Sequence, residues 1–197
     1  LSKRKVCIIG LGALGTVASQ YLVRSGIGEV HLIDPDQIEE SNLHRQINYT
    51  LEDVGDFKTE VSKNKLQKIN EITKIISHQT SYENYLKENA NENFDLVFDC
   101  TDNHENKILS SQLCKKNKIA YVSISINSTE GIYFSQNYKK DKTSSFACLF
   151  PQTDINHRCL NSAMIGPVAG FVTSLACTKI IFALANSSND LKSEINL

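Results

Sequence analysis

The sequence predicts an α/β protein built on a doubly wound, mostly parallel sheet, with antiparallel strands toward the C-terminal part. Three observations predict this class. The apolar segment 5–9 runs directly into a glycine-rich motif at residues 10–15. The acidic residue Asp34 lies at the end of the next strand pattern, 29–33. The rest of the chain alternates between short apolar segments and helical patterns, which is typical of a Rossmann-like sheet covered by helices on both faces.

The glycine motif predicts a nucleotide site. Gly10 permits a tight turn, Gly12 lets the backbone approach a phosphate, and Gly15 lets the following helix pack closely on the strand. That helix begins at Ala13, and its first turn offers free N–H groups and the positive end of a dipole to an anion. The carboxylate of Asp34 is placed to accept hydrogen bonds from ribose hydroxyls. The alternative is a glycine-rich turn without a ligand.

The remaining patterns predict one domain over residues 1–186. Helical spacing appears at 16–24, 57–69, 83–89 and 106–116, and strand patterns appear at 74–81, 94–100, 119–126 and 131–138. We expect residues 139–159 to form a mobile crossover loop and the polar tail 187–197 to fray.

Composition excludes some function classes. The 197 residues carry a net charge of −1, so no basic field favours nucleic-acid binding. The six cysteines show no Cys-x-x-Cys pair, which indicates a reducing, cytoplasmic setting rather than a disulfide framework.

One apolar segment, 163–185, is long enough to cross a membrane. Lys179 lies inside it, and Gly166-Pro167 and Gly170 interrupt its start. An interior charge disfavours a membrane span. A helix buried between a sheet and a partner subunit explains the composition equally well.

A second group of polar residues distinguishes the nucleotide. Arg45 lies in the segment 41–46, Lys58 begins a helical pattern, and Asp102 follows the strand pattern 94–100. All three are expected at the carboxyl edge of the sheet, where ligands bind. Two cations and a carboxylate that could hold Mg²⁺ match a nucleoside triphosphate better than a dinucleotide. The alternatives are a solvated helix start for Lys58 and a helix cap for Asp102 with Asn103.

These residues carry a resemblance to the ubiquitin-activating-enzyme-like adenylyltransferases, the family of the MoeB, ThiF and HesA proteins. The most specific matches are the strings Ser-Asn-Leu-x-Arg-Gln at 41–46 and Asp-Cys-Thr-Asp-Asn at 99–103. Residues 10–15, 34–36, 58 and 165–170 also match, so the resemblance covers most of the chain.

The resemblance implies an ATP- and Mg²⁺-dependent reaction in which the C-terminal carboxylate of a small ubiquitin-like sulfur-carrier protein or a peptide attacks the α-phosphate. An acyl-adenylate and pyrophosphate result. Under this resemblance Asp34 holds the ribose, Asn42, Arg45 and Lys58 bind phosphates, Asp102 holds Mg²⁺, and Ala13, Ser41 and Asn103 line the nucleotide. It also implies a homodimer in which the helix 164–185 forms much of the contact.

The cysteines depart from that family. Where relatives carry a four-cysteine zinc site, this chain has Ser145-Phe146-Ala147-Cys148 and no second pair, so we expect no structural zinc. Cys159 lies where some relatives carry a cysteine that attacks the activated carrier or carries sulfur. A cysteine that only anchors the loop is the alternative, and Cys148 is a weaker candidate nucleophile.

Two other functions stay open on the sequence alone. An NAD(P)-dependent oxidoreductase would use the same glycine motif. A non-catalytic nucleotide-binding scaffold of the same fold would account for the missing zinc ligands. Both ends are shorter than is usual in the family, so a fragment and a reduced member are both possible.

Overall fold

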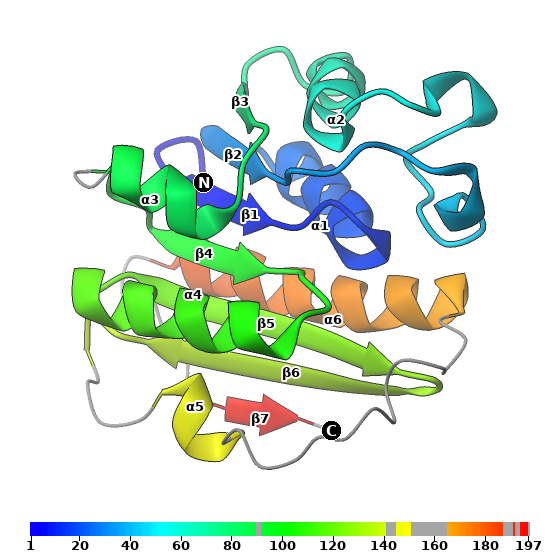
Figure 1. Ribbon diagram of the computed structural model, residues 1–197. Helices are drawn as coiled ribbons and strands as arrows, with labels where there is room; N and C mark the ends of the chain where they lie inside the picture. Colours follow the sequence, from blue (N-terminus) through cyan, green and yellow to red (C-terminus); the bar gives the residue numbers. More distant parts are fainter. Residues whose placement is uncertain (90–91, 141–144, 151–164, 187–190, 192–193, 197) are drawn as a thin grey trace.

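The computed structural model describes residues 1–89, 92–140, 145–150, 165–186, 191 and 194–196. Within these residues the chain forms one seven-stranded sheet with the order β3-β2-β1-β4-β5-β6-β7 (Figure 1). The strands are β1 (Lys5–Ile9), β2 (Glu29–Ile33), β3 (Lys74–His78), β4 (Leu96–Asp99), β5 (Ala120–Asn127), β6 (Glu130–Asn137) and β7 (Glu194–Asn196). Strands β1 to β5 pair in parallel, whereas β6 and β7 are antiparallel to their neighbours. The predicted fold class is therefore confirmed.

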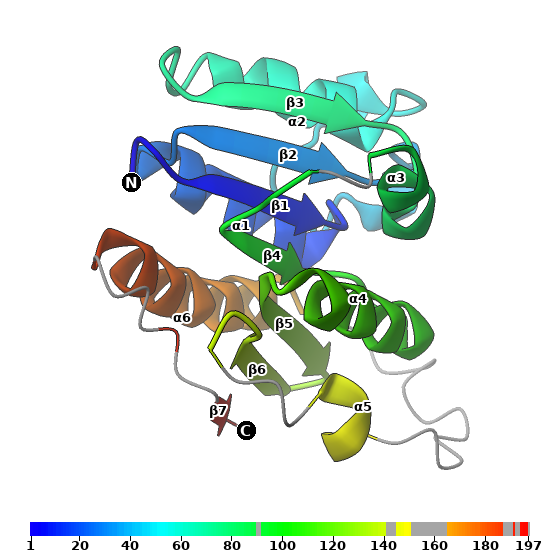
Figure 2. The same cartoon turned by 90° about the vertical axis from the view of Figure 1, so that its left-hand side faces the viewer.

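Helices cover both faces of the sheet (Figures 1 and 2). One face is covered by α1 (Ala13–Arg24), α2 (Lys58–Gln67) and α6 (Gly166–Ala185), and the other by α3 (Tyr82–Glu88), α4 (His104–Asn117) and α5 (Phe146–Leu149). The alternation of side chains along β1 explains the two cores. Val6 and Ile8 belong to the first core, while Cys7 and Ile9 belong to the second.

The parallel pairing brings the carboxyl ends of three strands together. Ile9 at the end of β1 pairs with Ile33 of β2 and with Asp99 of β4. The glycine motif, the segment after Asp34 and the segment after Asp99 therefore leave the sheet at one edge. Two short 3₁₀ helices, η1 (Glu40–Asn42) and η2 (Leu51–Asp53), lie in the connection between β2 and α2.

Helix α6 has the length and composition of a membrane-spanning helix. It packs on α1 and on strands β5 and β6, and Ala176, Cys177 and Ile180 are buried there. The Lys179 ammonium lies 4.8 Å from the centre of the Tyr133 ring. Within the structure α6 is thus a core helix on one side, while Phe171 and Phe182 are exposed on the other.

Two expectations about the C-terminal part differ from the structure. Within the predicted loop 139–159, Phe146–Leu149 form the short helix α5, because Phe146 packs against Phe134 and Phe150. The tail does not fray throughout, because Glu194–Asn196 add to β6 as strand β7. An edge strand exposes unpaired N–H and C=O groups, so even a polar segment can pair there. Cys159 and residues 151–164 lie outside the described residues.

Candidate nucleotide-binding site

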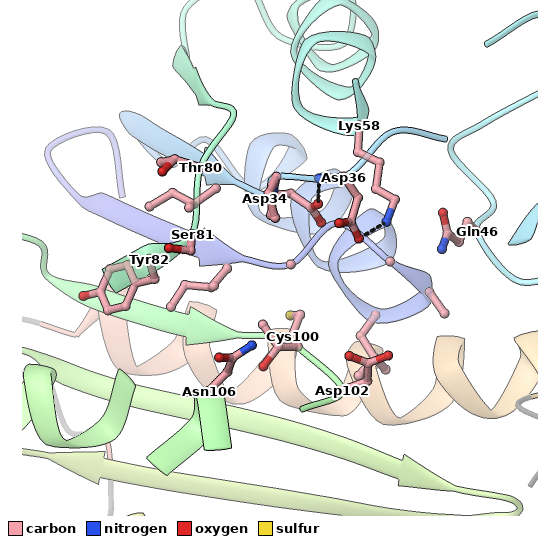
Figure 3. Close-up of a pocket in the computed structure, with 18 of the residues that line it drawn as sticks. Asp34, Asp36, Gln46, Lys58, Thr80, Ser81, Tyr82, Cys100, Asp102 and Asn106 are labelled. Atoms are coloured by element: carbon pink, nitrogen blue, oxygen red, sulfur yellow. Dashed lines mark hydrogen bonds and ion pairs between the residues drawn. The ribbon is translucent and has the colours of Figure 1, made fainter. Parts of the chain in front are cut away.

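A cavity of about 490 Å³ lies at the carboxyl ends of β1, β2 and β4 (Figure 3). Most of the predicted site residues line it. They are Gly10, Gly12, Ala13, Asp34, Asn42, Arg45, Lys58 and Asp102. In Figure 3, Lys58 extends from α2 on one side of this space and Asp102 lies on the other.

The three glycines serve three different purposes. Gly10 has a φ of +83°, and a Cβ there would lie 3.1 Å from the backbone nitrogen of Thr101. A Cβ on Gly15 would lie 1.8 Å from the carbonyl oxygen of Gly10, so only glycine lets α1 pack this closely. A Cβ on Gly12 would meet only the side chain of Gln46, at 3.8 Å. Packing therefore requires Gly10 and Gly15, whereas the space beside Gly12 faces the cavity.

The first turn of α1 is suited to an anion. Gly12 is the N-cap residue, no side chain caps the turn, and no acidic residue lies in it. The N–H groups of a helix N-terminus carry partial positive charge and bind phosphate readily. The cavity reaches this turn at Gly12, Ala13 and Leu14.

Asp34 is buried directly after β2, with 4% of its surface exposed. Its carboxylate accepts hydrogen bonds from the backbone N–H of Leu11 at 2.6 Å and of Asp36 at 2.8 Å. Burial raises the pKa of Asp34 above its ordinary value, although the Lys58 charge and these hydrogen bonds oppose the rise. Each carboxylate oxygen accepts more than one hydrogen bond, so Asp34 can also accept from a ribose hydroxyl.

Lys58 is buried at the start of α2, so the alternative of a solvated helix start is wrong. Its Nζ donates to Asp36 Oδ2 at 2.8 Å. The backbone N–H of Lys58 also donates to the carbonyl of Asp36 at 3.1 Å. The cation is thus fixed beside the segment that follows Asp34.

Arg45 reaches the cavity from the connection after β2. Its guanidinium donates to Asn42 Oδ1 and to His44 Nε2. Asn42 in turn donates to Glu39 Oε2 at 3.2 Å, as does the exposed Ser41. Ser41 does not line the cavity, so the structure separates it from the residues that the resemblance grouped with it.

Asp102 and Asn103 have different positions. Asn103 Oδ1 accepts from the backbone N–H of Asn106 at 3.0 Å, which makes Asn103 the N-cap of α4. Asn103 does not line the cavity. Asp102 is exposed and lines the cavity without taking part in the cap, so the capping alternative holds for Asn103 alone.

A buried network fixes the segment that carries Asp102. Asp99 Oδ1 accepts from the backbone N–H and the hydroxyl of Thr101, at 3.0 and 2.6 Å. Asp99 Oδ2 accepts from the Tyr121 hydroxyl at 2.9 Å, and the Lys107 ammonium lies 3.5 Å from Oδ1. The turn after β4 is therefore held by several side chains whose roles the sequence did not indicate.

Sequence reasoning missed other residues of the cavity. Among them are Asp36, Gln46, Thr80, Ser81, Tyr82, Asn106 and Ser110. Asp36 and Gln46 lie inside the matched strings, but the strings indicated no role for either. Thr80, Ser81 and Tyr82 follow β3, and the rule that parallel strands deliver their carboxyl ends to one edge could have found them.

Cys148 is the one predicted nucleophile that the structure describes. It is exposed, and its Sγ lies 3.3 Å from the Ser145 hydroxyl. Hydrogen bonds from Ser145 lower the pKa of the Cys148 thiol. Cys7, Cys100, Cys114 and Cys177 are buried free thiols, and burial raises the pKa of each.

Comparison with known proteins decides the family. The ThiF family matches residues 1–196, which is almost the whole chain. The chain belongs to the ThiF family. This membership agrees with the resemblance inferred from the strings at 41–46 and 99–103.

Relatives of the chain are named adenylyltransferase and sulfurtransferase. The protein uba4 of Aspergillus niger is 33% identical over 93% of this chain and 40% of its own length. MOCS3 of Dictyostelium discoideum is 29% identical over 98% of this chain and 46% of its own length. The chain thus spans less than half of the length of these ThiF-family relatives.

Solved structures show the same architecture. Escherichia coli MccB is 25% identical, with a TM-score of 0.82, over all of this chain and 62% of that one. MccB in complex with AMPCPP and MccA is 28% identical, with a TM-score of 0.78, over 92% of this chain and 55% of that one.

Proposed function

We propose that this ThiF-family chain is an ATP-dependent adenylyltransferase that activates the C-terminal carboxylate of a small ubiquitin-like carrier protein or a peptide. One observation carries the proposal. Arg45, Lys58 and Asp102 line one cavity together with the glycine motif and the buried Asp34. A nucleotide with several phosphates needs this positive charge, whereas a dinucleotide is bound largely by backbone N–H groups.

The chemistry requires two anions to meet. The acceptor carboxylate forms a bond to the α-phosphorus of ATP, the bond to the pyrophosphate oxygen breaks, and pyrophosphate leaves. The carboxylate is already ionised at neutral pH, so no general base is needed. Arg45, Lys58 and the first turn of α1 reduce the repulsion and stabilise the leaving pyrophosphate.

Asp102 fits the role of magnesium ligand. Mg²⁺ binds through one or two carboxylates together with substrate phosphates. Asp102 is an exposed carboxylate on the side of the cavity opposite Lys58, and it does not cap α4 (Figure 3). When bound there, Mg²⁺ would neutralise phosphate charge in addition to the two cations.

We further propose that the acceptor and the assembly follow the family. The resemblance implies a carrier-protein or peptide acceptor, and the similar MccB has been solved together with both AMPCPP and MccA.

A second copy of the chain would cover the exposed side of α6. Phe171, Leu175 and Phe182 lie on that side at helical spacing and are 74%, 43% and 69% exposed. The free thiols agree with a cytoplasmic setting.

The test is ATP–pyrophosphate exchange that depends on an added acceptor. Lys58→Ala and Asp102→Ala should each abolish exchange, whereas Lys68→Ala, at the exposed far end of α2, should retain it. Retained exchange in both cavity variants would refute phosphate binding by Lys58 and Mg²⁺ binding by Asp102. ATP binding without pyrophosphate exchange for any acyl donor would favour a non-catalytic nucleotide-binding scaffold. NAD binding that survives Arg45→Ala would favour the oxidoreductase.

A further inference from the structure

A second cluster of polar side chains lies away from the nucleotide cavity, toward the amino-terminal end of β2. It consists of Glu29 and His31 on β2 and of Glu92 in the segment between α3 and β4. One possible metal-ligand atom from each of these three residues lies within 4.8 Å of the other two. None of the three lines the cavity, so the proposed function does not use them.

The fold holds all three ligands in place. Residues 29 and 31 are two apart on a strand, so their side chains lie on the same face of the sheet. His31 is buried, and its Nε2 lies 2.7 Å from Glu29 Oε1. The backbone N–H of Glu92 donates to the carbonyl of Asn89 at 3.0 Å. The sheet therefore positions two of the ligands, and a backbone hydrogen bond positions the third.

The other side of the His31 ring is supported by two further residues. Its Nδ1 lies 3.1 Å from His78 Nε2 and 3.3 Å from the Tyr85 hydroxyl oxygen. A metal-ligating histidine usually donates its other ring N–H to an acceptor, which fixes the tautomer and the orientation of the ring. With a metal on Nε2, Nδ1 of His31 would carry the proton, and either neighbour can accept that hydrogen bond.

The space between the two carboxylates already attracts positive charge. The Lys5 ammonium lies 2.8 Å from Glu29 Oε1 and also contacts Glu92 Oε1. Lys74 pairs with Glu29 Oε2 at 3.1 Å. The Lys5 and Lys74 side chains are 25% and 65% exposed, so water can solvate both ammonium groups when another cation replaces them. A divalent ion bound by two carboxylates and a neutral imidazole gives a site without net charge, which avoids the cost of a buried unpaired charge.

We propose that Glu29, His31 and Glu92 bind a divalent transition-metal ion of the zinc class, which displaces the Lys5 ammonium. An imidazole with two carboxylates suits Zn²⁺, whereas Mg²⁺ prefers oxygen ligands alone. Three protein ligands leave a fourth position for water. The site uses no cysteine, so it differs from the four-cysteine zinc site of relatives. It is also independent of the proposed function.

Calorimetric titration of the metal-stripped protein with Zn²⁺, without nucleotide and with excess Mg²⁺ to fill oxygen-only sites, tests the proposal. Glu92→Gln should weaken Zn²⁺ binding by roughly 10-fold or more, because loss of a ligand costs at least as much as loss of a supporting group. Lys5→Met should strengthen binding, because it removes the competing cation. Glu88→Gln, at the exposed end of α3, is the matched control and should bind Zn²⁺ as the wild type does. Zn²⁺ should also raise the Tm more in the wild type than in Glu92→Gln.

Spectroscopy identifies the ligands. Proton–nitrogen NMR of the histidine rings should show that Zn²⁺ moves the His31 proton from Nε2 to Nδ1. Co²⁺ in place of Zn²⁺ should give d–d absorption without thiolate charge-transfer bands, which excludes the cysteines as ligands.

Several outcomes would overturn the metal site. They are a wild type without saturable Zn²⁺ binding, equal affinity in the wild type and Glu92→Gln, weaker binding in Lys5→Met, an unchanged His31 tautomer, and thiolate absorption that accounts for the bound Co²⁺. Failure of pyrophosphate exchange would refute the adenylyltransferase function alone, because the cluster lies outside the cavity.

Discussion

Lys58 Nζ lies 2.8 Å from Asp36 Oδ2, and the two side chains differ sharply in exposure. The Lys58 side chain is 7% exposed, whereas that of Asp36 is 63% exposed at the cavity. A buried ammonium is costly without an anion beside it. Asp36 therefore stabilises the cation in the ligand-free protein, and phosphate oxygens can provide the same compensation once a nucleotide binds.

Substitution of each partner should separate catalysis from stability. Lys58→Met removes a cation from the developing pyrophosphate, so exchange should fall by roughly 100-fold or more. Asp36→Asn leaves the ammonium without its anion, so the free energy of unfolding should fall by about 1 kcal/mol without ligand. Because ATP would restore the lost anion, its stabilising effect on Tm should be larger in Asp36→Asn than in the wild type. An equal ATP-induced shift in both proteins would contradict this relationship.

Two of the glycines should respond to alanine in opposite ways. In Gly15→Ala the new Cβ would lie 1.8 Å from a backbone oxygen, so the free energy of unfolding should fall by roughly 3 kcal/mol. In Gly12→Ala the new Cβ would meet no atom closer than 3.8 Å, so stability should change by less than about 1 kcal/mol. Nucleotide affinity should nevertheless fall in Gly12→Ala, because the methyl group occupies the space beside the anion position. Denaturant unfolding and nucleotide titration together test the pair.

Asp102 and Asn103 are neighbours with separable roles. Asp102→Asn should raise the Mg²⁺ concentration needed for half-maximal exchange by about 10-fold while leaving Tm unchanged, since a carboxylate ligand is lost. Asn103→Ala removes the N-cap of α4 and should lower stability by about 1 kcal/mol. Its Mg²⁺ dependence should match that of the wild type. A shifted Mg²⁺ requirement in Asn103→Ala alone would reverse the assignment.

Acid should destabilise the fold through a buried histidine. Burial lowers the pKa of His31 to about 4, against the opposing effect of its hydrogen bond to Glu29. Burial acts to raise the pKa of Glu29, but hydrogen bonds from Lys5, His31 and Lys74 outweigh it and lower that pKa to about 2. Both folded pKa values lie below the unfolded ones, so the unfolded state binds more protons in acid and stability falls as the pH is lowered.

The histidine and the glutamate act over different pH windows. The His31 contribution falls between pH 6.5 and 4, and the Glu29 contribution between pH 4.5 and 2. From pH 7 to 4 the histidine alone should cost roughly 2 to 3 kcal/mol of unfolding free energy. Denaturant unfolding at several pH values measures this slope, which His31→Phe should flatten above pH 4.5. An unchanged slope in that variant would assign the effect to other groups.

Cys159 should act after adenylation rather than in it. Cys159→Ala is expected to retain acceptor-dependent pyrophosphate exchange and to lose only a later sulfur or acyl transfer. Cys148→Ala is the matched comparison, because Cys148 is the exposed thiol among the described residues, and loss of the later step in this variant alone would assign that step to Cys148. Loss of exchange itself in Cys159→Ala would contradict this division.

Much of the fold and part of the site could be predicted from local sequence. Apolar segments and helical spacing indicated the elements from β1 to β6, because backbone periodicity is a local property. The strings at 41–46 and 99–103 indicated Arg45 and Asp102, since strand ends in a parallel sheet meet at one edge. The role of Gly15 also followed from its spacing alone, and the 1.8 Å contact explains why it must be glycine.

Only the tertiary structure decided which polar residues face the ligand and which support the fold. Asn103 and Asp102 are adjacent in sequence, but helix geometry makes one a cap and leaves the other in the cavity. Burial of Lys58 and its pairing with Asp36 depend on distant segments, the loop after β2 and helix α2, that the fold brings together. The pairing of β7 with the edge of β6 is likewise a long-range contact, and the polar composition of the tail does not predict it. The sequence determines local conformation. The burial of a polar side chain, and its hydrogen-bond or ion-pair partner, are decided only when distant segments pack together and exclude water.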